Sequence, residues 1–385
     1  MFKPVSLVSL ASVSSLGSSP KDIWKNYITE SHHLSEFVSK SGTSIVSKLN
    51  PVDTAKIQSL KASNKFYKNL DLSVLYAIFA ADNAHQKSQW LSADSVGINI
   101  GSSRGATNLF EKHFKTFLKN NKVSPLSSPT TTLGNISSWV AHHLNTNGPN
   151  ISHSITCSTS LHSVLNAVAW LNSGMCDKFI VGGSEAPLTE FTIAQMQALG
   201  IYANKYSKFP CQALDLKKTN NSMVLGEGAA IACLEAGFSS NAIALISGIG
   251  YATEILNTNT SISSDAACLQ KSMQMATESI DNDDVDVIIT HTPGTIKGDQ
   301  AEMQAIKKAF GKTIPAITTN KWKLGHTLAS SGMLSVELAT HMIEHQKFIS
   351  VPYLKQQKQP KQIKNILVNS VGFGGNAVSL LISSP

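Results

Sequence analysis

The chain has 385 residues, of which 42% are hydrophobic and 15% are charged. This composition predicts a stable globular protein with enough material for two ordinary domains or one large layered domain. No run of about 20 uninterrupted apolar residues occurs, so the sequence excludes a conventional membrane-spanning helix. The start of the chain lacks the compact apolar core and cleavage site of a secretory signal peptide, and a first strand followed by a loop fits it better.

The cysteines indicate the redox environment of the protein, and the net charge indicates the kind of partner that it binds. Five cysteines without C-x-x-C spacing argue against a disulfide framework or a zinc site, and they favour a reducing cytoplasm. The formal net charge of +7 and the pI near 9.0 predict an acidic partner. Nucleic acid is disfavoured as that partner, because no aromatic residues alternate with a basic stripe.

Strand and helix patterns alternate through the first half of the chain. Ser19 before Pro20, with Asp22 three residues on, predicts a helix start with an acidic first turn. Residues 96–100 predict a buried strand, which leads through a glycine- and serine-containing turn into an amphipathic helix. The same order of strand, turn and helix recurs at residues 154–174 and again at residues 179–199.

The second half continues the alternation up to its last segment. Strands are predicted within residues 242–253, 284–291 and 315–320, and helices within residues 266–280, 299–310 and 327–346. Two strands joined through glycines end the chain, at residues 365–383. Alternating strands and helices predict mostly parallel sheets covered on both faces, and the pattern divides into two similar halves, 1–238 and 239–385.

Cys157 lies in the segment SITCSTSLHSVL, where an apolar stretch turns into a helical pattern. The start of a helix favours a thiolate, because unpaired backbone N–H groups and the helix dipole stabilise negative charge. The small hydroxyl residues that follow would leave room for a substrate. Free cysteine is also among the most buried residue types, so packing remains an alternative role. The other four cysteines lack such a context and are interpreted as packing residues.

Two histidines follow predicted strands in positions suited to catalysis. His291 ends the apolar strand pattern of residues 286–290 and opens a glycine-containing turn. His326 follows Gly325 between a strand and a helix, with Lys321 five residues earlier. Sites in open α/β sheets gather at the carboxyl edge of the sheet, so both histidines are candidate partners of a reactive cysteine, with a structural role as the alternative. His162 is closer in sequence to Cys157, but a five-residue offset on a helix turns it away.

The glycine-rich segment SVGFGGNAVS is a fourth candidate feature. Three glycines within four residues around Phe373 could bring backbone N–H groups to an oxyanion, and a tight hairpin is the alternative interpretation. The segments GSSRGAT and GEGA fall short of the phosphate-loop and dinucleotide-binding patterns, which excludes nucleotide binding on motif grounds.

Taken in chain order, these four segments resemble the motifs of the β-ketoacyl-[acyl carrier protein] synthases, the condensing enzymes of fatty acid and polyketide synthesis. TCSTSLHS resembles the nucleophile motif, HTPGTIKGDQAE the first-histidine motif, NKWKLGH the lysine and second-histidine motif, and NSVGFGGN the C-terminal glycine turn. The resemblance covers essentially the whole chain. It implies a thiolase-like fold, in which two similar halves form a five-layered α-β-α-β-α core, and it implies a dimer.

The resemblance also implies roles for the candidate residues. Cys157 would carry the growing acyl chain as a thioester. His291 and His326 would promote decarboxylation of malonyl-carrier protein and stabilise the enolate, and Lys321 would hold the second histidine in position. The N–H groups of Cys157 and Phe373 would form the oxyanion hole, and Phe373 would gate access to the cysteine.

Substrate binding follows from the same resemblance, with departures from the family pattern. Thr295, Gly374 and Gly375 would bind the substrate, which arrives on the phosphopantetheine arm of acyl carrier protein, with no metal and no permanently bound cofactor. Thr292 and Pro293 replace the usual glycine and threonine after the first histidine, so that only Thr295 is kept of the two threonines that reach the pantetheine arm in the family. With Ala329-Ser330-Ser331-Gly332 and Asn376 also atypical, the chain resembles a specialised branch, such as one serving a secondary polyketide or an aryl polyene.

A group of lysines provides a candidate surface for the acidic carrier protein. Lys56, Lys61, Lys65 and Lys68 precede a long helical stretch, in the region where such synthases receive the carrier. A solvated lysine-rich loop is the alternative interpretation.

Other functions remain to be weighed against an active condensing enzyme. A chain-length-factor-like subunit of a heterodimer generally lacks the nucleophile, whereas Cys157 and both histidines are present here. A Cys/His hydrolase would need one histidine and would give no role to Lys321 or to the glycine motif. A thiolase would be expected to have a second catalytic cysteine near the C-terminus, and none follows Cys268. The dimer could form with a second copy of the chain or with a paralogous subunit.

Overall fold

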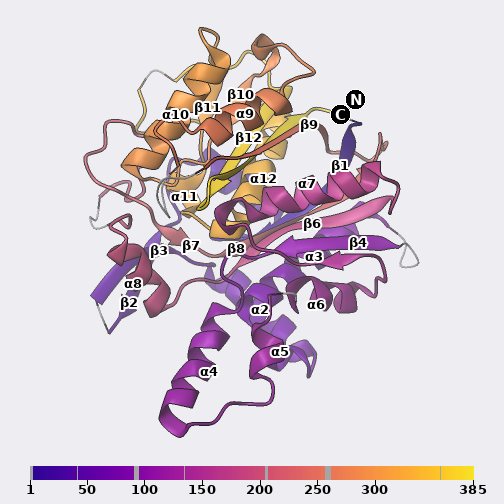
Figure 1. The fold of residues 1–385 in the computed structure, drawn as a ribbon, viewed down its shortest axis with the longest axis vertical. Coiled ribbons are helices and arrows are strands. Elements are labelled where there is room, and N and C mark those ends of the chain that lie inside the picture. Colours follow the sequence, from indigo (N-terminus) through magenta and orange to yellow (C-terminus); the bar gives the residue numbers. More distant parts are fainter. Residues whose placement is uncertain are drawn as a thin grey trace.

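The computed structural model describes residues 3–40, 42–90, 95–133, 135–203, 207–255, 262–355 and 357–385. Two five-stranded sheets and the helices that cover them dominate the fold (Figure 1). No helix in the described ranges is long and apolar enough to cross a membrane.

The first sheet is built from strands of the first half of the chain. Its strands, in spatial order, are β1 (Val5–Val13), β8 (Gly228–Ala236), β6 (Lys178–Glu185), β4 (Val96–Gly101) and β5 (Asn150–Ile151). The two pairings that involve β8 are antiparallel, while β4 pairs in parallel with β6 and with β5. Nearly every side chain of the four longer strands is buried, as expected of strands covered on both faces.

The second sheet is built from strands of the second half. Its strands, in spatial order, are β11 (Ala316–Thr318), β10 (Val287–Ile289), β12 (Asn365–Gly372), β13 (Asn376–Ser383) and β9 (Ala244–Thr253). Strands β11, β10 and β12 run parallel, whereas β13 pairs antiparallel with β12 and β9. Both sheets are therefore mixed. The prediction of mostly parallel sheets was wrong, because two of the four strand pairings in each sheet are antiparallel.

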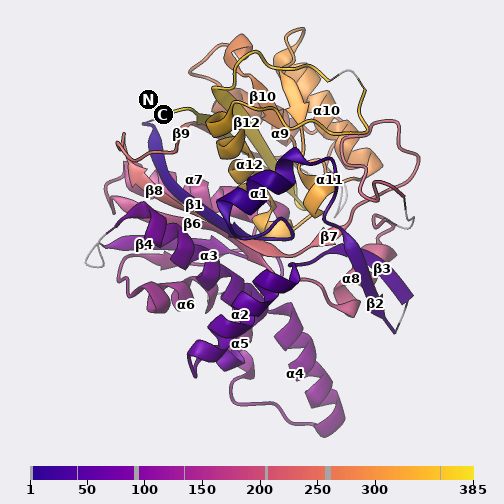
Figure 2. The same ribbon diagram turned by 180° about the vertical axis from the view of Figure 1, so that it is seen from behind.

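Helices form three layers around the two sheets, which confirms the predicted five-layered order (Figures 1 and 2). The middle layer is α7 (Thr159–Asn172) and α12 (Ser331–His345), whose apolar side chains join one cluster with strands of both sheets. The outer face of the first sheet is covered by α3 (Leu72–Ser88) and α6 (Asn135–Leu144). The outer face of the second is covered by α9 (Ala267–Ala276) and α10 (Ile296–Phe310).

The remaining elements surround this core. A small side sheet contains β2 (Ser35–Ser39), β3 (Gly42–Ser47) and β7 (Leu225–Gly226). The other helices are α1 (Pro20–Ile28), α2 (Pro51–Ser63), α4 (Thr107–Asn120), α5 (Ser127–Thr131), α8 (Glu190–Ala198) and the short α11 (Lys321–Leu324). Ser19 caps α1 by accepting a hydrogen bond from the Asp22 N–H, as its sequence predicts. The division at residue 238 stays a prediction, although the two large sheets draw their strands from residues 5–236 and 244–383.

Candidate active site

Three parallel strands of the second sheet bring candidate residues to one edge. His291 follows the end of β10, and Lys321 with His326 follows the end of its neighbour β11. Phe373 follows the end of β12, the other neighbour of β10. Because parallel strands end at the same side of a sheet, residues more than eighty positions apart in the chain meet there.

Cys157 faces this edge from the start of the middle-layer helix α7. It lies in a single 3-10 turn, Thr156–Ser158, that leads directly into α7. Thr156 has a φ of 48°, in the left-handed region, so the chain turns sharply before the cysteine. Burial raises the pKa of the Cys157 thiol to about 12, with a smaller contribution from the Glu185 carboxyl and an opposing one from Lys321. The thiol is therefore protonated at neutral pH when no substrate is bound.

The structure brings the cysteine and the two histidines together. One potential ligand atom of each of Cys157, His291 and His326 lies within 4.8 Å of the others, and all three side chains are buried. The two imidazole rings are 5.1 Å apart between centroids and nearly perpendicular. His162 does not join them, and its Nδ1 instead contacts the carbonyl of Ser158.

Both histidines of this cluster are neutral at physiological pH. Burial lowers the pKa of His326 to about 3, and the nearby Lys321 charge adds to the effect. Burial also lowers the pKa of His291 well below its ordinary value, followed by the influence of His326 and Lys321. A neutral imidazole carries one N–H, so each ring can donate one hydrogen bond to an oxygen placed between them.

Lys321 is a buried cation behind the histidines. Its Nζ donates a hydrogen bond of 3.1 Å to Asn320 Oδ1. Burial lowers the pKa of Lys321 to about 8, while the Glu302 carboxylate is the largest influence in the opposite direction. Glu302 accepts hydrogen bonds from the backbone N–H groups of His291 and Thr292 and thereby fixes the loop that carries the first histidine.

Two buried carboxyl groups support the site without having been identified from the sequence. Glu302 lies in the helix predicted within residues 299–310, and Glu185 lies in the strand, turn and helix pattern of residues 179–199. Glu185 accepts hydrogen bonds from Ser102 Oγ, from the N–H groups of Ser103 and Arg104, and from the Ala329 N–H. Only the strand-end position of Glu185 could have signalled its role, because the groups that it joins are remote in sequence.

The glycine segment forms the hairpin turn between β12 and β13, and this turn contacts the cysteine loop. A Cβ on Gly372 would lie 1.9 Å from Thr156 Oγ1 and 3.2 Å from the Cys157 nitrogen. Gly374 and Gly375 have φ values of 95° and 71°, a conformation that side chains rarely allow. Phe373 at the tip is 41% exposed, and its carbonyl accepts a hydrogen bond from Thr156 Oγ1.

The turn after His291 shows what the atypical residues do. Thr295 caps α10 by accepting a hydrogen bond from the Gly298 N–H, and it is partly exposed. Thr292 is fully buried, with its hydroxyl bonded to that of Thr290. Thr292 is therefore directed into the protein, which leaves Thr295 as the accessible threonine of this turn.

The four lysines proposed to meet a carrier protein differ in their contacts. Lys56 forms an ion pair of 2.8 Å with the buried Asp53 and a hydrogen bond with Ser18. Lys65 and Lys68 are exposed, whereas Lys61 in the last turn of α2 is partly exposed. Lys56 is thus committed to holding α2, and the other three are more available to a partner.

Two groups in the described part of the chain bring one potential ligand atom from each of three metal-ligating side chains within 4.8 Å of one another. One is the Cys157, His291 and His326 cluster, and the other is His341, Glu344 and His345 on α12. The expectation that the active site holds no metal stays a prediction.

Comparisons with known proteins show the family to which the chain belongs. The beta-ketoacyl synthase N-terminal domain matches residues 2–237, and the C-terminal domain matches residues 243–354. The 3-oxoacyl-[acyl-carrier-protein] synthase 2 of Coxiella burnetii is 26% identical over 411 residues, which cover 98% of this chain and 98% of the relative. The enzyme of the same name from Staphylococcus aureus strain COL is 26% identical over 417 residues, covering 98% and 97%.

Solved structures share the fold over the full length. The ishigamide ketosynthase/chain length factor superposes with a TM-score of 0.89 at 17% identity, covering 100% of both chains. The ketosynthase ApeO in complex with its chain length factor ApeC, from Xenorhabdus doucetiae, gives a TM-score of 0.81 at 18% identity, covering 100% of this chain and 98% of that one. With both family domains matched in order along the chain, the protein belongs to the beta-ketoacyl synthase family.

Proposed function

We propose that this protein is a β-ketoacyl-[acyl carrier protein] synthase, which elongates a Cys157-bound acyl group by decarboxylative Claisen condensation with malonyl-carrier protein. The observation that carries the proposal is the buried cluster of one cysteine and two neutral histidines. Family membership and the names of the full-length relatives support it.

The first step is acyl transfer to the cysteine. The Cys157 sulfur forms a bond to the acyl carbon, the thioester bond to pantetheine breaks, and the thiol proton passes to the departing pantetheine sulfur. This exchange needs no net proton uptake, which suits a thiol whose pKa burial has raised. The position at the N-terminus of α7 stabilises negative charge on the sulfur as the proton leaves.

The second step is formation of the carbon nucleophile. The bond between the malonyl carboxylate and its α-carbon breaks, CO₂ leaves, and the electron pair moves onto the thioester oxygen as an enolate. His291 and His326 each donate an N–H to that oxygen, where charge develops. Lys321 and Glu302 act as positioning residues behind the two rings.

The third step joins the two carbons. The enolate carbon attacks the Cys157 thioester, and the oxyanion that forms is stabilised by the N–H groups of Cys157 and Phe373. Collapse of this intermediate releases the elongated β-ketoacyl product and the Cys157 thiolate, which takes up a proton from water to restore the thiol. The close approach of Gly372 to the Cys157 nitrogen supports this assignment, because it brings the glycine turn beside the nucleophile.

The substrate is presented on the phosphopantetheine arm of acyl carrier protein, with no permanently bound cofactor. Thr295 is assigned to the arm, and Gly374 with Gly375 shapes its path beside Phe373. Lys61, Lys65 and Lys68 are assigned to the acidic carrier surface. The exposure of Lys65 and Lys68, the partial exposure of Lys61 and the net charge of +7 support the carrier assignment.

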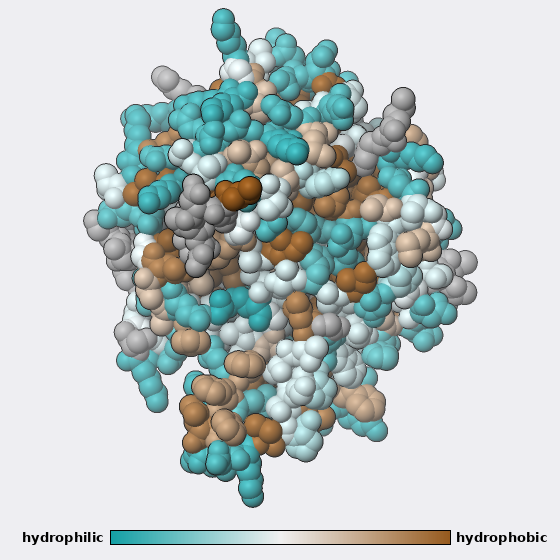
Figure 3. All heavy atoms as spheres, in the orientation of Figure 1, coloured by the Kyte–Doolittle hydropathy of each residue, from teal (hydrophilic) through white to brown (hydrophobic). Residues whose placement is uncertain are grey.

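The protein is also proposed to act as a dimer, with itself or with a paralogous subunit. Helix α4 projects from the rest of the fold (Figure 1), and its large apolar side chains are unusually open to solvent: Phe110 is 62%, Phe114 52% and Leu118 68% exposed. Figure 3 shows apolar residues gathered on this projection. An exposed patch of this kind is typical of a protein interface.

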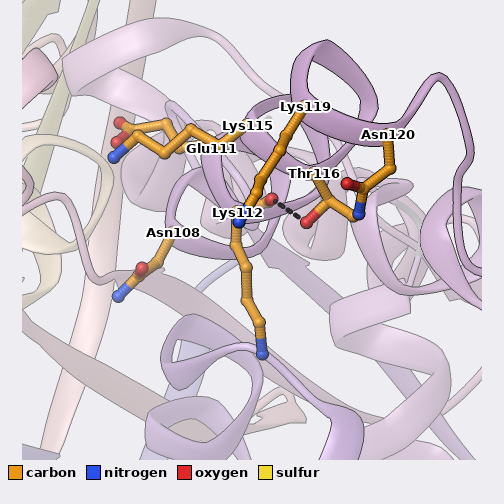
Figure 4. A pocket seen from close by; sticks show the side chains of 7 residues that line it. All are labelled: Asn108, Glu111, Lys112, Lys115, Thr116, Lys119 and Asn120. Atoms are coloured by element: carbon orange, nitrogen blue, oxygen red, sulfur yellow. Dashed lines mark hydrogen bonds between the residues drawn. The ribbon is translucent and has the colours of Figure 1, made fainter.

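The opposite face of α4 is polar. A pocket there is lined by Asn108, Glu111, Lys112, Lys115, Thr116, Lys119 and Asn120 (Figure 4). Because the apolar and lysine-rich faces are separate, a partner would cover the first and leave the second in water.

A chain-length-factor role is disfavoured, because Cys157 and both histidines are retained and assembled. We place the enzyme in the cytoplasm, in fatty acid or aryl polyene-like polyketide synthesis. The five free cysteines support a reducing compartment. Residues 1–238 would supply the nucleophile, and residues 239–385 both histidines and the glycine turn.

Intact-mass spectrometry tests the function. Wild-type protein mixed with acyl-carrier protein should gain the mass of the acyl group, and malonyl-carrier protein should then discharge it as the elongated product. Cys157→Ala should gain no mass. If the variant is acylated and condenses, the site assignment is wrong; if wild type is acylated by none of a series of chain lengths, the partner-subunit function is favoured instead.

A further inference from the structure

A second cluster of ligand-type side chains lies at the C-terminal end of α12. His341, Glu344 and His345 occupy positions i, i+3 and i+4, so they share one helix face. His341 Nδ1 lies 3.5 Å from Glu344 Oε2, and His345 Nε2 lies 3.7 Å from the same oxygen. The active-site elements are at the other end of this helix, since α12 begins at Ser331 directly after the turn Leu328–Ser330, whose Leu328 packs with Cys157.

The distances suit a single small ion. Two ligands that are each about 2.0–2.1 Å from a tetrahedral zinc ion lie roughly 3.3–3.4 Å from each other. The two measured separations exceed this by only a few tenths of an ångström, and one ligand atom of each residue lies within 4.8 Å of the others. Small side-chain rotations would close the remaining gap without movement of the helix backbone.

The buried histidine of the cluster has a nitrogen without a well-formed hydrogen bond. His341 is 8% exposed, and its Nδ1 meets no hydrogen-bond criterion within the described ranges, although the Glu344 carboxylate lies 3.5 Å away. A metal ion between the two residues would replace this long contact with two short ligand bonds. Burial lowers the pKa of His341, which favours the neutral form of the ring that a metal ion binds. The Lys87 charge opposes a cation here, while the Glu344 carboxylate offsets it.

Aromatic stacking orients the ring of His345, the second histidine of the cluster, before any ion binds. The His345 ring lies on Trp24 of α1, with centroids 4.2 Å apart and planes inclined by 18°. The His341 and His345 rings are themselves nearly parallel, 5.9 Å apart. Helix α1 lies against this part of the fold in Figure 2. Because the rings are already oriented, less conformational freedom is lost on binding an ion.

We propose that His341, Glu344 and His345 form a site for a divalent transition-metal ion of the zinc, nickel or copper class, with water completing the coordination. Two imidazoles and one carboxylate suit these metals, whereas magnesium and calcium prefer all-oxygen sites. The ion would cross-link three side chains at the C-terminal end of α12. The site is independent of the proposed condensation chemistry.

Zinc titration of chelator-treated protein tests the site. Cys157→Ala serves as the parent, because it removes the sulfur of the other candidate cluster. Isothermal titration calorimetry and competition with a chromophoric chelator should show one zinc per chain. His345→Ala in this parent should bind at least tenfold more weakly, and Glu344→Gln several-fold more weakly. Unchanged affinity in His345→Ala, or no zinc bound by the parent while wild type binds it, would overturn the proposal.

Thermal unfolding provides a second readout and a fold control. The exposed His142 is the matched control, since it also lies in the last turn of a helix but outside the cluster. Saturating zinc should raise the melting temperature of the parent and of its His142→Ala derivative, and should leave that of the His345→Ala and Glu344→Gln derivatives nearly unchanged. Equal increases in all four proteins would contradict the site. The exposed Glu344 tests it even if His345→Ala fails to fold.

Discussion

Gly372 lies directly against Thr156, so that a methyl group on the glycine would be only 1.9 Å from the threonine hydroxyl. The two residues belong to different halves of the chain, and their contact sets the glycine turn beside the cysteine. Ser370 strengthens the same junction, because its hydroxyl donates a hydrogen bond of 3.2 Å to the Cys157 carbonyl.

Gly372→Ala should therefore displace the cysteine turn. We expect a stability loss of about 1–3 kcal/mol from overpacking, and a decrease in condensation rate of about 100-fold, since catalysis is sensitive to displacements near 1 Å. Urea unfolding and product formation measure the two effects. Adding Thr156→Ala removes the hydroxyl that the new methyl group meets and should restore part of both. A double variant no better than Gly372→Ala would show that this contact is not the cause.

How far the sequence predicts the site depends on the distance between its parts. Cys157, His291 and His326 could be identified because each follows a strand pattern at a turn, and the structure does assemble them. Glu302 could not, because a carboxylate on an amphipathic helix predicts a solvated face until the fold shows that it bonds the loop of His291.

The fold, like the site, could be predicted from the sequence only where local patterns determine it. The strand and helix order was predicted well, since local periodicity determines it. The sequence correctly predicts an amphipathic helix at α4, but its periodicity contains no information on what covers the apolar face, and within this chain Phe110 and Phe114 remain exposed. Likewise, the antiparallel pairing of β8 with β1 joins residues more than 200 positions apart, which no local pattern specifies.

The lysines at the end of α2 and directly after it should control delivery by the carrier protein. The triple variant Lys61→Glu, Lys65→Glu and Lys68→Glu should raise the KM for acyl-carrier protein at least tenfold, because attraction between opposite charges guides the two proteins together. The rate with a small acyl thioester that needs no carrier should be unchanged. Steady-state kinetics with both substrates measure the difference, and a parallel loss with the small thioester would point to a folding defect.

Lys56→Gln is the matched variant for that experiment. Lys56 is on the same helix as Lys61 but is paired with Asp53. Loss of this ion pair should lower the stability slightly, as expected for an ion pair that is partly exposed. The KM for the carrier protein should stay within about twofold of the wild-type value. A carrier defect as large as that of the triple variant would mean that overall charge, and not this surface, governs delivery.

The exposed face of α4 should be covered in the dimer. Phe114→Glu would place a charge in an apolar interface and should convert the dimer to monomer, as measured by light scattering during size-exclusion chromatography. Lys115→Glu, one position along on the polar face, should leave the dimer intact. If both variants remain dimeric, the dimer uses another surface. If wild type is monomeric alone, a paralogous subunit is the expected partner.

Glu337 in the middle layer should make stability depend on pH. It is fully buried on α12, its Oε2 has no hydrogen-bond partner within the described ranges, and burial raises its pKa to about 7. The unfolded chain releases this proton near pH 4.5, whereas the folded protein retains it up to about pH 7. The folded state therefore binds more protons between these values, and the contribution of this group to stability, complete below pH 4.5, is lost as the pH rises to 7.

Glu337→Gln removes that dependence, because the amide is neutral at every pH. At pH 8 the variant should be more stable than wild type by up to about 3 kcal/mol, since wild type must then bury a carboxylate. At pH 5 the difference should be much smaller. Urea unfolding at the two pH values gives the comparison. A Glu337→Gln variant with the same stability difference at both pH values would mean that this carboxyl group does not titrate in the folded protein over that range.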